Sequence, residues 1–193
     1  MRDAEATRRR VLDAATAEFA ARGIAGARVD RIAAAARSNK AQMYAYFGSK
    51  EGLFDAVLTL HLGRILDAAP LTADDLPGYA VRIYDAHLAN PGFVRLAGWA
   101  RLERTGTGEL FEDAEGHAAK TAAIAEAQEH GLIDPSLTPE DVLQTVIALA
   151  MTWSPISATY TASAAEPDDV HEHRRQLLRR LVARLVTAPD ASS

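Results

Sequence analysis

Side chains suited to contacts with nucleic acid gather between residue 28 and residue 50 of this chain. Lysine and arginine cations neutralise phosphates, tyrosine hydroxyls hydrogen-bond to phosphate oxygens, and a glutamine amide can pair with a base edge, with adenine as its natural bidentate partner. These residue types predict binding to double-stranded DNA. The candidates are Arg28, Arg37, Lys40, Gln42, Tyr44, Tyr46 and Lys50.

The charge of the chain is divided unevenly along its length. Residues 1–50 contain ten Lys or Arg and five Asp or Glu, a net charge of +5, whereas residues 51–193 contain 11 basic and 21 acidic residues, a net charge of −10. A basic segment on an acidic body is typical of a protein that binds nucleic acid at one end. The alternative is a solvated basic face without a partner, and we interpret the three consecutive arginines at 8–10 in that way.

Two short helices joined by a tight turn would position the candidate side chains. Apolar residues recur at helical spacing over 29–36 and over 40–46, with a three-residue break, Arg37-Ser38-Asn39, between them. Asn39 is suited to be the N-cap of the second of these helices, because its side-chain oxygen can accept from an otherwise unpaired amide. This pattern predicts a helix-turn-helix, which places its second helix in the major groove.

The rest of the chain also predicts helices, so we expect an all-α fold. Ala, Leu, Arg and Glu dominate, and alternating β-branched runs are absent. A first helix over 3–22 ends at a C-cap glycine, Gly23, and Ser49 caps a fourth helix. Later helices are expected over 76–89, 91–104, 109–130, 139–153 and 167–187, with Gly131 as a stop.

The N-terminal segment contains, in order, Phe19, Gly23, Ile32-Ala33, Ala36, Tyr44, Tyr46-Phe47, Ser49-Lys50-Glu51 and Leu53. In this combination it resembles the DNA-binding region of the TetR family of transcriptional regulators. The resemblance implies that Tyr44, Tyr46 and Lys50 touch phosphates and that residues around Lys40–Met43 meet bases, which adds Asn39, Ala41 and Met43 to the candidates. It also implies a homodimer whose recognition helices enter successive major grooves of a palindromic operator, roughly 34–36 Å apart.

The turn departs from the usual pattern of the family. Members usually have a glycine, a small apolar residue and a serine or threonine where this chain has Arg37, Ser38 and Asn39. Arg28 stands where a threonine often begins the second helix of the chain. A turn without glycine can still form, and a cation close to a helix C-terminus is electrostatically favourable.

Aromatic, polar and flexible side chains gather on the later helices. Such a mixture can line an apolar pocket with a few polar groups, and it can equally form an ordinary core. Because the resemblance implies a second domain that varies with its ligand, we name these residues as a candidate ligand pocket. They are Tyr84, His87, Phe93, Trp99, Met151 and Trp153, with Tyr160 as a further member of the cluster.

Two C-terminal segments carry apolar stripes wide enough to pack within the domain and still offer surface to a symmetric partner. The resemblance implies that the last two helices form a four-helix dimer interface. The stripes also contain Leu143, Ala150, Val182 and Val186, and the interface candidates are Val142, Val146, Ile147, Leu177, Leu178, Leu181 and Leu185.

The sequence offers little support for catalysis or for a bound metal. It has no cysteine, and the pairs Asp74-Asp75 and Asp168-Asp169 lie in first helical turns, where the helix dipole explains them. His171 and His173, two residues apart, would point to different sides of a helix. We expect no enzyme activity, no metal and no cofactor. The short apolar runs and the polar N-terminus predict a cytoplasmic protein without a membrane partner.

The sequence therefore predicts an N-terminal three-helix DNA-binding domain over 1–48, a larger helical ligand-sensing and dimerisation domain over 49–187, and a flexible tail over 188–193. The expected function is a transcriptional repressor released from its operator by an unidentified small, apolar effector. The alternative is a helical protein-interaction module that has lost DNA binding, which the altered turn and the acidic body would favour.

Overall fold

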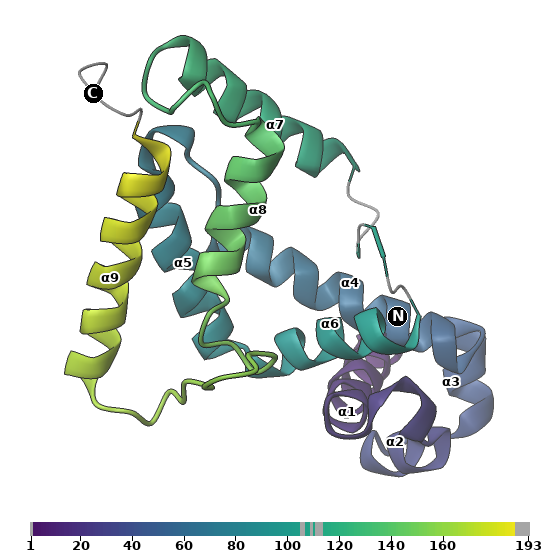
Figure 1. Ribbon diagram of the computed structural model, residues 1–193. Coiled ribbons are helices and arrows are strands. Elements are labelled where there is room, and N and C mark those ends of the chain that lie inside the picture. The colour runs from purple at the N-terminus through teal and green to yellow at the C-terminus, as the bar shows by residue number, and fades with distance from the viewer. Residues whose placement is uncertain (1, 105–106, 109, 111–113, 188–193) are drawn as a thin grey trace. The chain divides into compact units, whose positions relative to one another are not determined.

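Every regular element is helical in the part of the chain that the computed structural model describes, which is residues 2–104, 107, 108, 110 and 114–187 (Figure 1). The all-α prediction is confirmed. The predicted tail over 188–193 lies outside the described residues. In chain order the elements are α1 Arg2–Gly26, α2 Val29–Ala35, α3 Lys40–Phe47, α4 Lys50–Ala68, the 3₁₀ turn η1 Ala73–Asp75, α5 Leu76–Ala89, α6 Pro91–Glu103, α7 Ala114–Glu129, α8 Pro139–Ala150 and α9 Asp168–Val186.

Contacts divide the chain into two compact units, each with its own buried side chains. The first unit comprises Met1–Arg64 and Asn90–Leu110, and the second comprises Ile65–Ala89 and Phe111–Ser193. Helix α6 thus belongs to the N-terminal unit although it follows α5 in sequence, and α4 begins in one unit and ends in the other. The functional boundary after residue 48 stays a prediction. Among the described helices, none is both long and apolar enough to cross a membrane.

An aromatic pair lies at the centre of the first unit. The rings of Phe19 and Phe54 are fully buried, with centroids 5.1 Å apart and planes at 87°, the edge-to-face geometry that aromatic pairs favour. Phe19 comes from α1 and Phe54 from the start of α4, so the pair ties these helices together. Other buried side chains of this unit are Val11, Leu12, Ala15, Ile32, Leu53 and Val57.

The predicted C-cap glycine, Gly23, marks a break in α1. Its φ of 71° lies in the left-handed region that glycine adopts without steric cost, and a Cβ added there would lie 3.0 Å from the ring of Trp99. The carboxylate of Glu103 accepts from the amides of Ile24 at 3.2 Å and Ala25 at 2.7 Å. Helix α6 therefore packs on the break in α1 and also satisfies the two amides that follow it.

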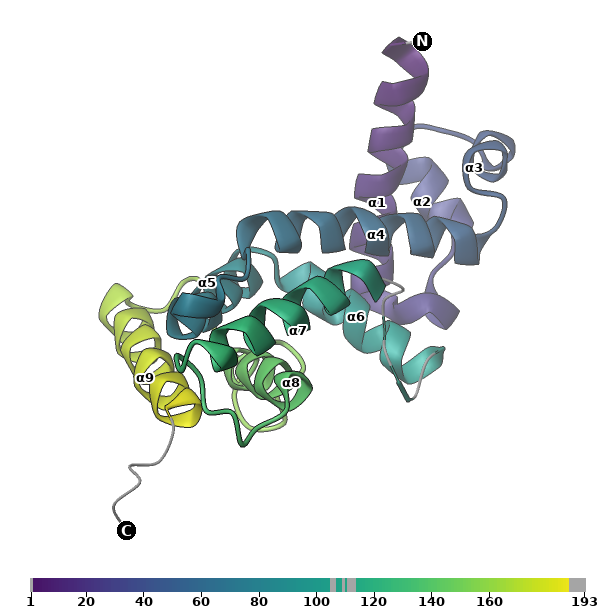
Figure 2. The same ribbon diagram turned by 90° about the horizontal axis from the view of Figure 1, so that it is seen from above.

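Three helices lie side by side in the second unit, namely α5, α8 and α9, and α7 packs against α8 (Figures 1 and 2). Val81 and Tyr84 of α5 form a buried cluster with Leu178 of α9. The buried face of α9 repeats every four residues, at Leu178, Val182 and Val186. This spacing is the helical period that the sequence predicts for a core-facing stripe.

Among the helices after α4, the end of α8 and the start of α7 differ most from the predicted boundaries. Helix α8 ends at Ala150 instead of residue 153, and the amides of Thr152 and Ser154 donate to Leu149 at 3.2 Å and Met151 at 2.9 Å, bonds that tighten the chain beyond the helical ladder. Helix α7 begins at Ala114, while residues 109 and 111–113 of its predicted start lie outside the described part of the chain. Its predicted stop, Gly131, is confirmed by a φ of 71°.

Candidate nucleic-acid interface

The turn between α2 and α3 is a Schellman motif. The amide of Ser38 donates to the carbonyl of Ala33 at 2.9 Å, and the amide of Arg37 donates to Ala34 at 3.2 Å, which are the two bonds that define the motif. Arg37 occupies the position that is usually glycine, and its φ is 50°. The predicted helix-turn-helix is therefore confirmed, with an arginine held in left-handed backbone that costs a residue with a Cβ roughly 1–2 kcal/mol.

Arginines of α1 support this turn. The Nε of Arg10 donates to the carbonyl of Ala36 at 3.3 Å, and its Nη2 donates to the buried hydroxyl of Thr7 at 2.8 Å. The guanidinium of Arg8 lies 5.5 Å from the centroid of the Phe47 ring. The three arginines at 8–10 are exposed, as their interpretation as a solvated face predicts, but two of them also connect α1 to the ends of α2 and α3.

Asn39 and Ser38 together hold Gln42 at the start of α3. The Oδ1 of Asn39 accepts from the backbone amide of Gln42 at 2.8 Å, which confirms the predicted N-cap. The hydroxyl of Ser38 donates to the Oε1 of Gln42 at 2.8 Å. Both the backbone and the side chain of Gln42 are thus fixed by the turn, and Ser38 was not among the predicted site residues. The predicted cap of α4 is also confirmed, since Ser49 Oγ accepts from the amide of Gly52 at 2.9 Å.

Most of the predicted DNA-contacting side chains lie at the surface of the first unit. Tyr44 retains 45% of its accessible surface, a large fraction for an aromatic residue. Gln42, Tyr46 and Lys50 are half-buried. The remaining exposed candidates are Arg28, Arg37, Asn39, Lys40 and Ala41.

Met43 lies in the core of the first unit. Only 2% of its surface is exposed, so its side chain cannot meet a base while α3 stays folded. Met43 is buried, whereas Ala41 and Tyr44 of the same helix are exposed, so Met43 lies on the inner face of α3. Its inclusion among the base-contacting candidates is therefore corrected: a contiguous stretch of a helix cannot direct all of its side chains outward.

Two of the basic candidates, Lys40 and Arg28, make contacts with acidic side chains. The Nζ of Lys40 lies 2.7 Å from Asp30 Oδ1, and this hydrogen bond raises the pKa of the lysine. An ion pair this exposed contributes little to stability, so Lys40 can exchange its partner for a phosphate at small cost. The backbone amide of Arg28 donates to Glu18 at 3.1 Å, which fixes the backbone while the guanidinium remains exposed.

Two family models match this chain. "Bacterial regulatory proteins, tetR family" matches residues 11–57, and "Tetracyclin repressor-like, C-terminal domain" matches residues 75–184. The chain belongs to the TetR family of transcriptional regulators. The resemblance of the N-terminal segment is thereby confirmed, and the TetR relationship extends through the second unit, where the sequence alone showed no specific resemblance.

Individual relatives agree with this assignment. The chain is 44% identical over 152 residues to the HTH-type transcriptional repressor SCO4008 of Streptomyces coelicolor, covering 77% of this chain and 79% of that protein. It is 34% identical over 108 residues to the HTH-type transcriptional repressor NicS of Pseudomonas putida, covering 52% and 51%. The crystal structure of SCO4942 from Streptomyces coelicolor superposes with a TM-score of 0.80 at 40% identity, covering 95% of this chain and 99% of that one.

The predicted pocket residues of this TetR chain are divided between the two units. Phe93 and Trp99 lie on α6 in the first unit, where the Phe93 ring stacks on His61 at a centroid distance of 6.4 Å. Trp99 packs on the backbone of Gly23. These contacts give both rings a structural role within the first unit.

The other predicted pocket residues belong to the second unit. Tyr84 and His87 are buried on α5, and the rings of Tyr84 and Trp153 meet edge-to-face with centroids 5.9 Å apart. Met151 and Trp153 are half-buried just beyond the end of α8, and Tyr160 is 53% exposed. The second unit therefore contains the four candidates Tyr84, His87, Met151 and Trp153.

Buried polar atoms accompany these side chains. Burial lowers the pKa of His87 to about 4, so its ring is neutral at pH 7. Its Nδ1 has no hydrogen-bond partner among the described residues, and neither do the Nε2 of His171 and the Oγ of Ser154. Such atoms are usually satisfied by water or by a ligand. Within the described residues, no group of three or more His, Asp or Glu could hold a metal ion.

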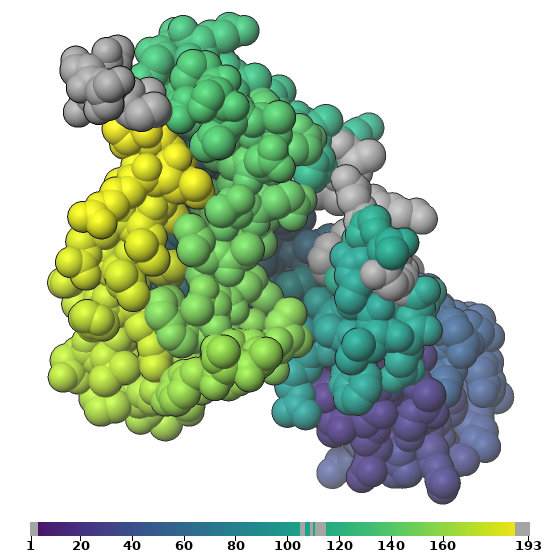
Figure 3. All heavy atoms as spheres, viewed as in Figure 1, coloured from purple at the N-terminus to yellow at the C-terminus, as the bar shows by residue number. Residues whose placement is uncertain are grey.

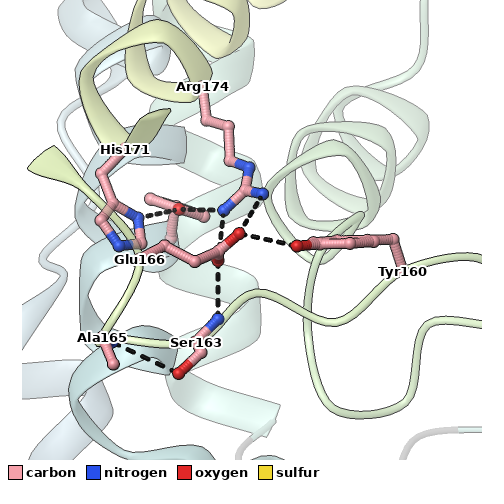
Figure 4. Close-up of polar contacts among 7 residues, drawn as sticks. Tyr160, Ser163, Ala165, Glu166, His171 and Arg174 are labelled. Atoms are coloured by element: carbon pink, nitrogen blue, oxygen red, sulfur yellow. Dashed lines mark hydrogen bonds and ion pairs between the residues drawn. The ribbon is translucent and has the colours of Figure 1, made fainter. Parts of the chain in front are cut away.

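A polar cluster ties the segment after α8 to α9 (Figure 4). The carboxylate of Glu166 accepts from Nη1 and Nη2 of Arg174 at 2.9 and 3.0 Å, from the hydroxyl of Tyr160 at 2.7 Å and from the amide of Ser163 at 2.8 Å. The hydrogen bonds from Arg174 are the largest cause that lowers the pKa of Glu166 to about 2. The Glu166 carboxylate thus connects the loop after α8 to the buried side chain of Arg174.

The predicted dimer residues differ in burial. Val142, Val146 and Leu178 are at most 1% exposed, so they pack inside their own unit and offer no surface to a partner. Leu181 is 39% exposed, and Ile147, Leu177 and Leu185 are half-buried. The outer sides of α8 and α9 lie on one face of the second unit (Figure 3). The leucines at 177, 181 and 185 form a second apolar stripe on α9, next to its buried face.

Replacing Arg37 tests the left-handed turn. Arg37→Gly is expected to have a free energy of unfolding about 1 kcal/mol higher than Arg37→Ala, because only glycine avoids the steric cost of this backbone. Urea denaturation followed by circular dichroism measures the difference, and comparing the two variants cancels the loss of the guanidinium. Equal stability would contradict a left-handed residue 37.

Replacing Glu166 tests the polar cluster through pH. A lowered pKa means that this carboxylate stabilises the fold fully above its ordinary value of 4.5 and loses that effect as pH falls toward about 2. Glu166→Gln should therefore be less stable than the parent at pH 7, and the gap should close between pH 4.5 and 2. Unfolding curves over this range measure it, with Glu126→Gln at an exposed site of α7 as the control. A gap that does not change with pH would refute the ionic role.

Proposed function

We propose that this TetR-family regulator is a repressor that binds a palindromic operator as a homodimer and is released by a small, largely apolar effector. Membership of the family makes it a DNA-binding transcriptional regulator, and its 44% identical relative is a repressor. The observation that carries the proposal is the outward-facing surface of α3 and of the turn before it.

Phosphate and base contacts are assigned to different side chains of that surface. The exposed hydroxyl of Tyr44 and the ammonium of Lys50, at the first residue of α4, suit phosphate contacts that position α3. Tyr46, Lys40 and the guanidinium groups of Arg28 and Arg37 extend the same phosphate-binding surface. Gln42 at the start of α3 is the candidate for reading a base edge, since it lies where recognition helices approach the groove.

The exposed stripe of α9 supports a homodimer. Leu177, Leu181 and Leu185 follow at four-residue steps and remain at least partly exposed while the neighbouring stripe is buried. Apolar surface repeated along a helix is typical of a symmetric interface. Two subunits are also what a palindromic operator requires.

The second unit supports an effector site. Tyr84, Trp153 and the neutral His87 supply aromatic surface, and the buried Nδ1 of His87 has no partner among the described residues. An effector that binds one conformation of this unit more tightly shifts the population toward it. Helix α4 is continuous from the first unit to the second, so it is the element through which such a shift would reach α3.

The altered turn does not favour the alternative of a module without DNA binding. Arg37 occupies the left-handed position of a complete Schellman motif, so the departure from glycine does not remove the helix-turn-helix. The net negative charge belongs to the second unit, whereas the exposed candidates belong to the first.

Substitutions on the first unit test the DNA contacts. Tyr44→Phe and Lys50→Ala should weaken binding to all duplexes, because phosphates are common to every sequence, and Lys50→Ala should reduce the salt slope by about 1. Fluorescence anisotropy with labelled DNA from upstream of the protein's own gene, across a salt series, measures both effects. Lys120→Ala on α7 is the control for a lost charge. If both variants bound DNA with unchanged affinity, Tyr44 and Lys50 would not belong to the DNA-binding surface.

A charge on the second stripe of α9 tests the dimer. Leu181→Glu should shift the protein from dimer to monomer, because an unpaired carboxylate is costly to bury between subunits. Leu132→Glu, at a 58% exposed leucine outside α9, is the matched control and should remain dimeric. Sedimentation velocity gives the masses. A Leu181→Glu protein that stays dimeric would place the interface elsewhere.

A further inference from the structure

We propose that Ser38 is a specificity-determining residue, which directs Gln42 to read guanine instead of adenine at one position of each half-site. This inference rests on the proposed binding of DNA by α3. It deepens that proposal by naming the base. It also differs from the expectation for a free glutamine, whose natural bidentate partner is adenine.

The position of the Ser38 hydroxyl is fixed by the turn. The backbone amide of Ser38 closes the Schellman motif onto the carbonyl of Ala33 at 2.9 Å. Arg10 holds the carbonyl of Ala36, two residues earlier, from α1. The hydroxyl therefore projects from backbone that is anchored on both sides, and it can act as a fixed donor.

The Gln42 side chain is held by that donor. Its Oε1 accepts from Ser38 at 2.8 Å, and its backbone amide is held by Asn39 at 2.8 Å. Gln42 is half-buried, so part of the residue is accessible to a partner. Because the hydrogen bond keeps Oε1 directed at the turn, the atom left for a base is Nε2, which carries two N–H donors and no acceptor.

The pattern of donors on Nε2 selects the base. The major-groove edge of adenine presents an acceptor at N7 and a donor at N6, so a bidentate contact needs both Nε2 and a free Oε1 side by side. Guanine presents two acceptors, N7 and O6, which match the donors of Nε2. A second lone pair on Oε1 does not restore the adenine contact while the bond to Ser38 keeps that oxygen turned away.

Selection of binding sites from a randomised duplex library tests the assignment, using the full-length protein and its variants. The parent should enrich guanine at one position of each half-site, and that enrichment should disappear in Gln42→Ala. Ser38→Ala frees Oε1 and should shift the ratio of guanine to adenine at that position roughly tenfold toward adenine, the lower part of the range for a good bidentate contact. Ser38→Thr keeps a hydroxyl and should keep guanine.

A double variant separates a direct role of Ser38 from an effect on the turn. In a Gln42→Ala background, adding Ser38→Ala should leave the base preference unchanged, because the side chain through which Ser38 acts is gone. Enrichment of adenine at the Gln42-dependent position of the parent would overturn this inference and leave the proposed DNA binding intact. The same ratio of guanine to adenine in the parent and in Ser38→Ala would do so too. A folded parent protein that enriches no sequence would overturn the proposed DNA binding, and this inference with it.

Discussion

The left-handed turn at Arg37 is the constraint on which the DNA-binding surface depends. Its two hydrogen bonds, from Arg37 to Ala34 and from Ser38 to Ala33, end α2 and set the direction in which α3 begins. The steric cost at Arg37 is of the same order as the contribution of one or two hydrogen bonds. The turn therefore depends on the contacts around it, among them the bond from Arg10.

In each unit a carboxylate ties a loop or a helix end to a neighbouring element. In the first unit Glu103 of α6 accepts from the amides at the break in α1, and in the second Glu166 joins the loop after α8 to Arg174 of α9. Hydrogen bonds to an ionised carboxylate are shorter and stronger than those between neutral groups. The apolar cores hold the helices together, and the hydrogen bonds of Glu103 and Glu166 fix a helix break and a loop that lie outside those cores.

Local sequence signals predicted the helices and their ends, but they could not predict contacts between residues far apart in the sequence. Asn39 as an N-cap and Gly23 as a C-cap act within a few residues, so the sequence located both. The bond from Arg10 to Ala36 and the packing of Trp99 on Gly23 join residues separated by 26 and by 76 positions, and no periodicity encodes them. Met43 was misplaced because the motif suggested a contiguous stretch, whereas burial follows the helical period.

Hydroxyl-radical footprinting of the parent protein on DNA from upstream of its own gene tests the central claim most directly, that a dimer presents two copies of α3 to one face of the duplex. The account predicts two protected windows whose centres lie roughly 34–36 Å apart along the axis, about one helical turn. Effector candidates can then be screened by loss of that protection. A single window, or uniform weak protection by protein that is folded and dimeric, would contradict the account.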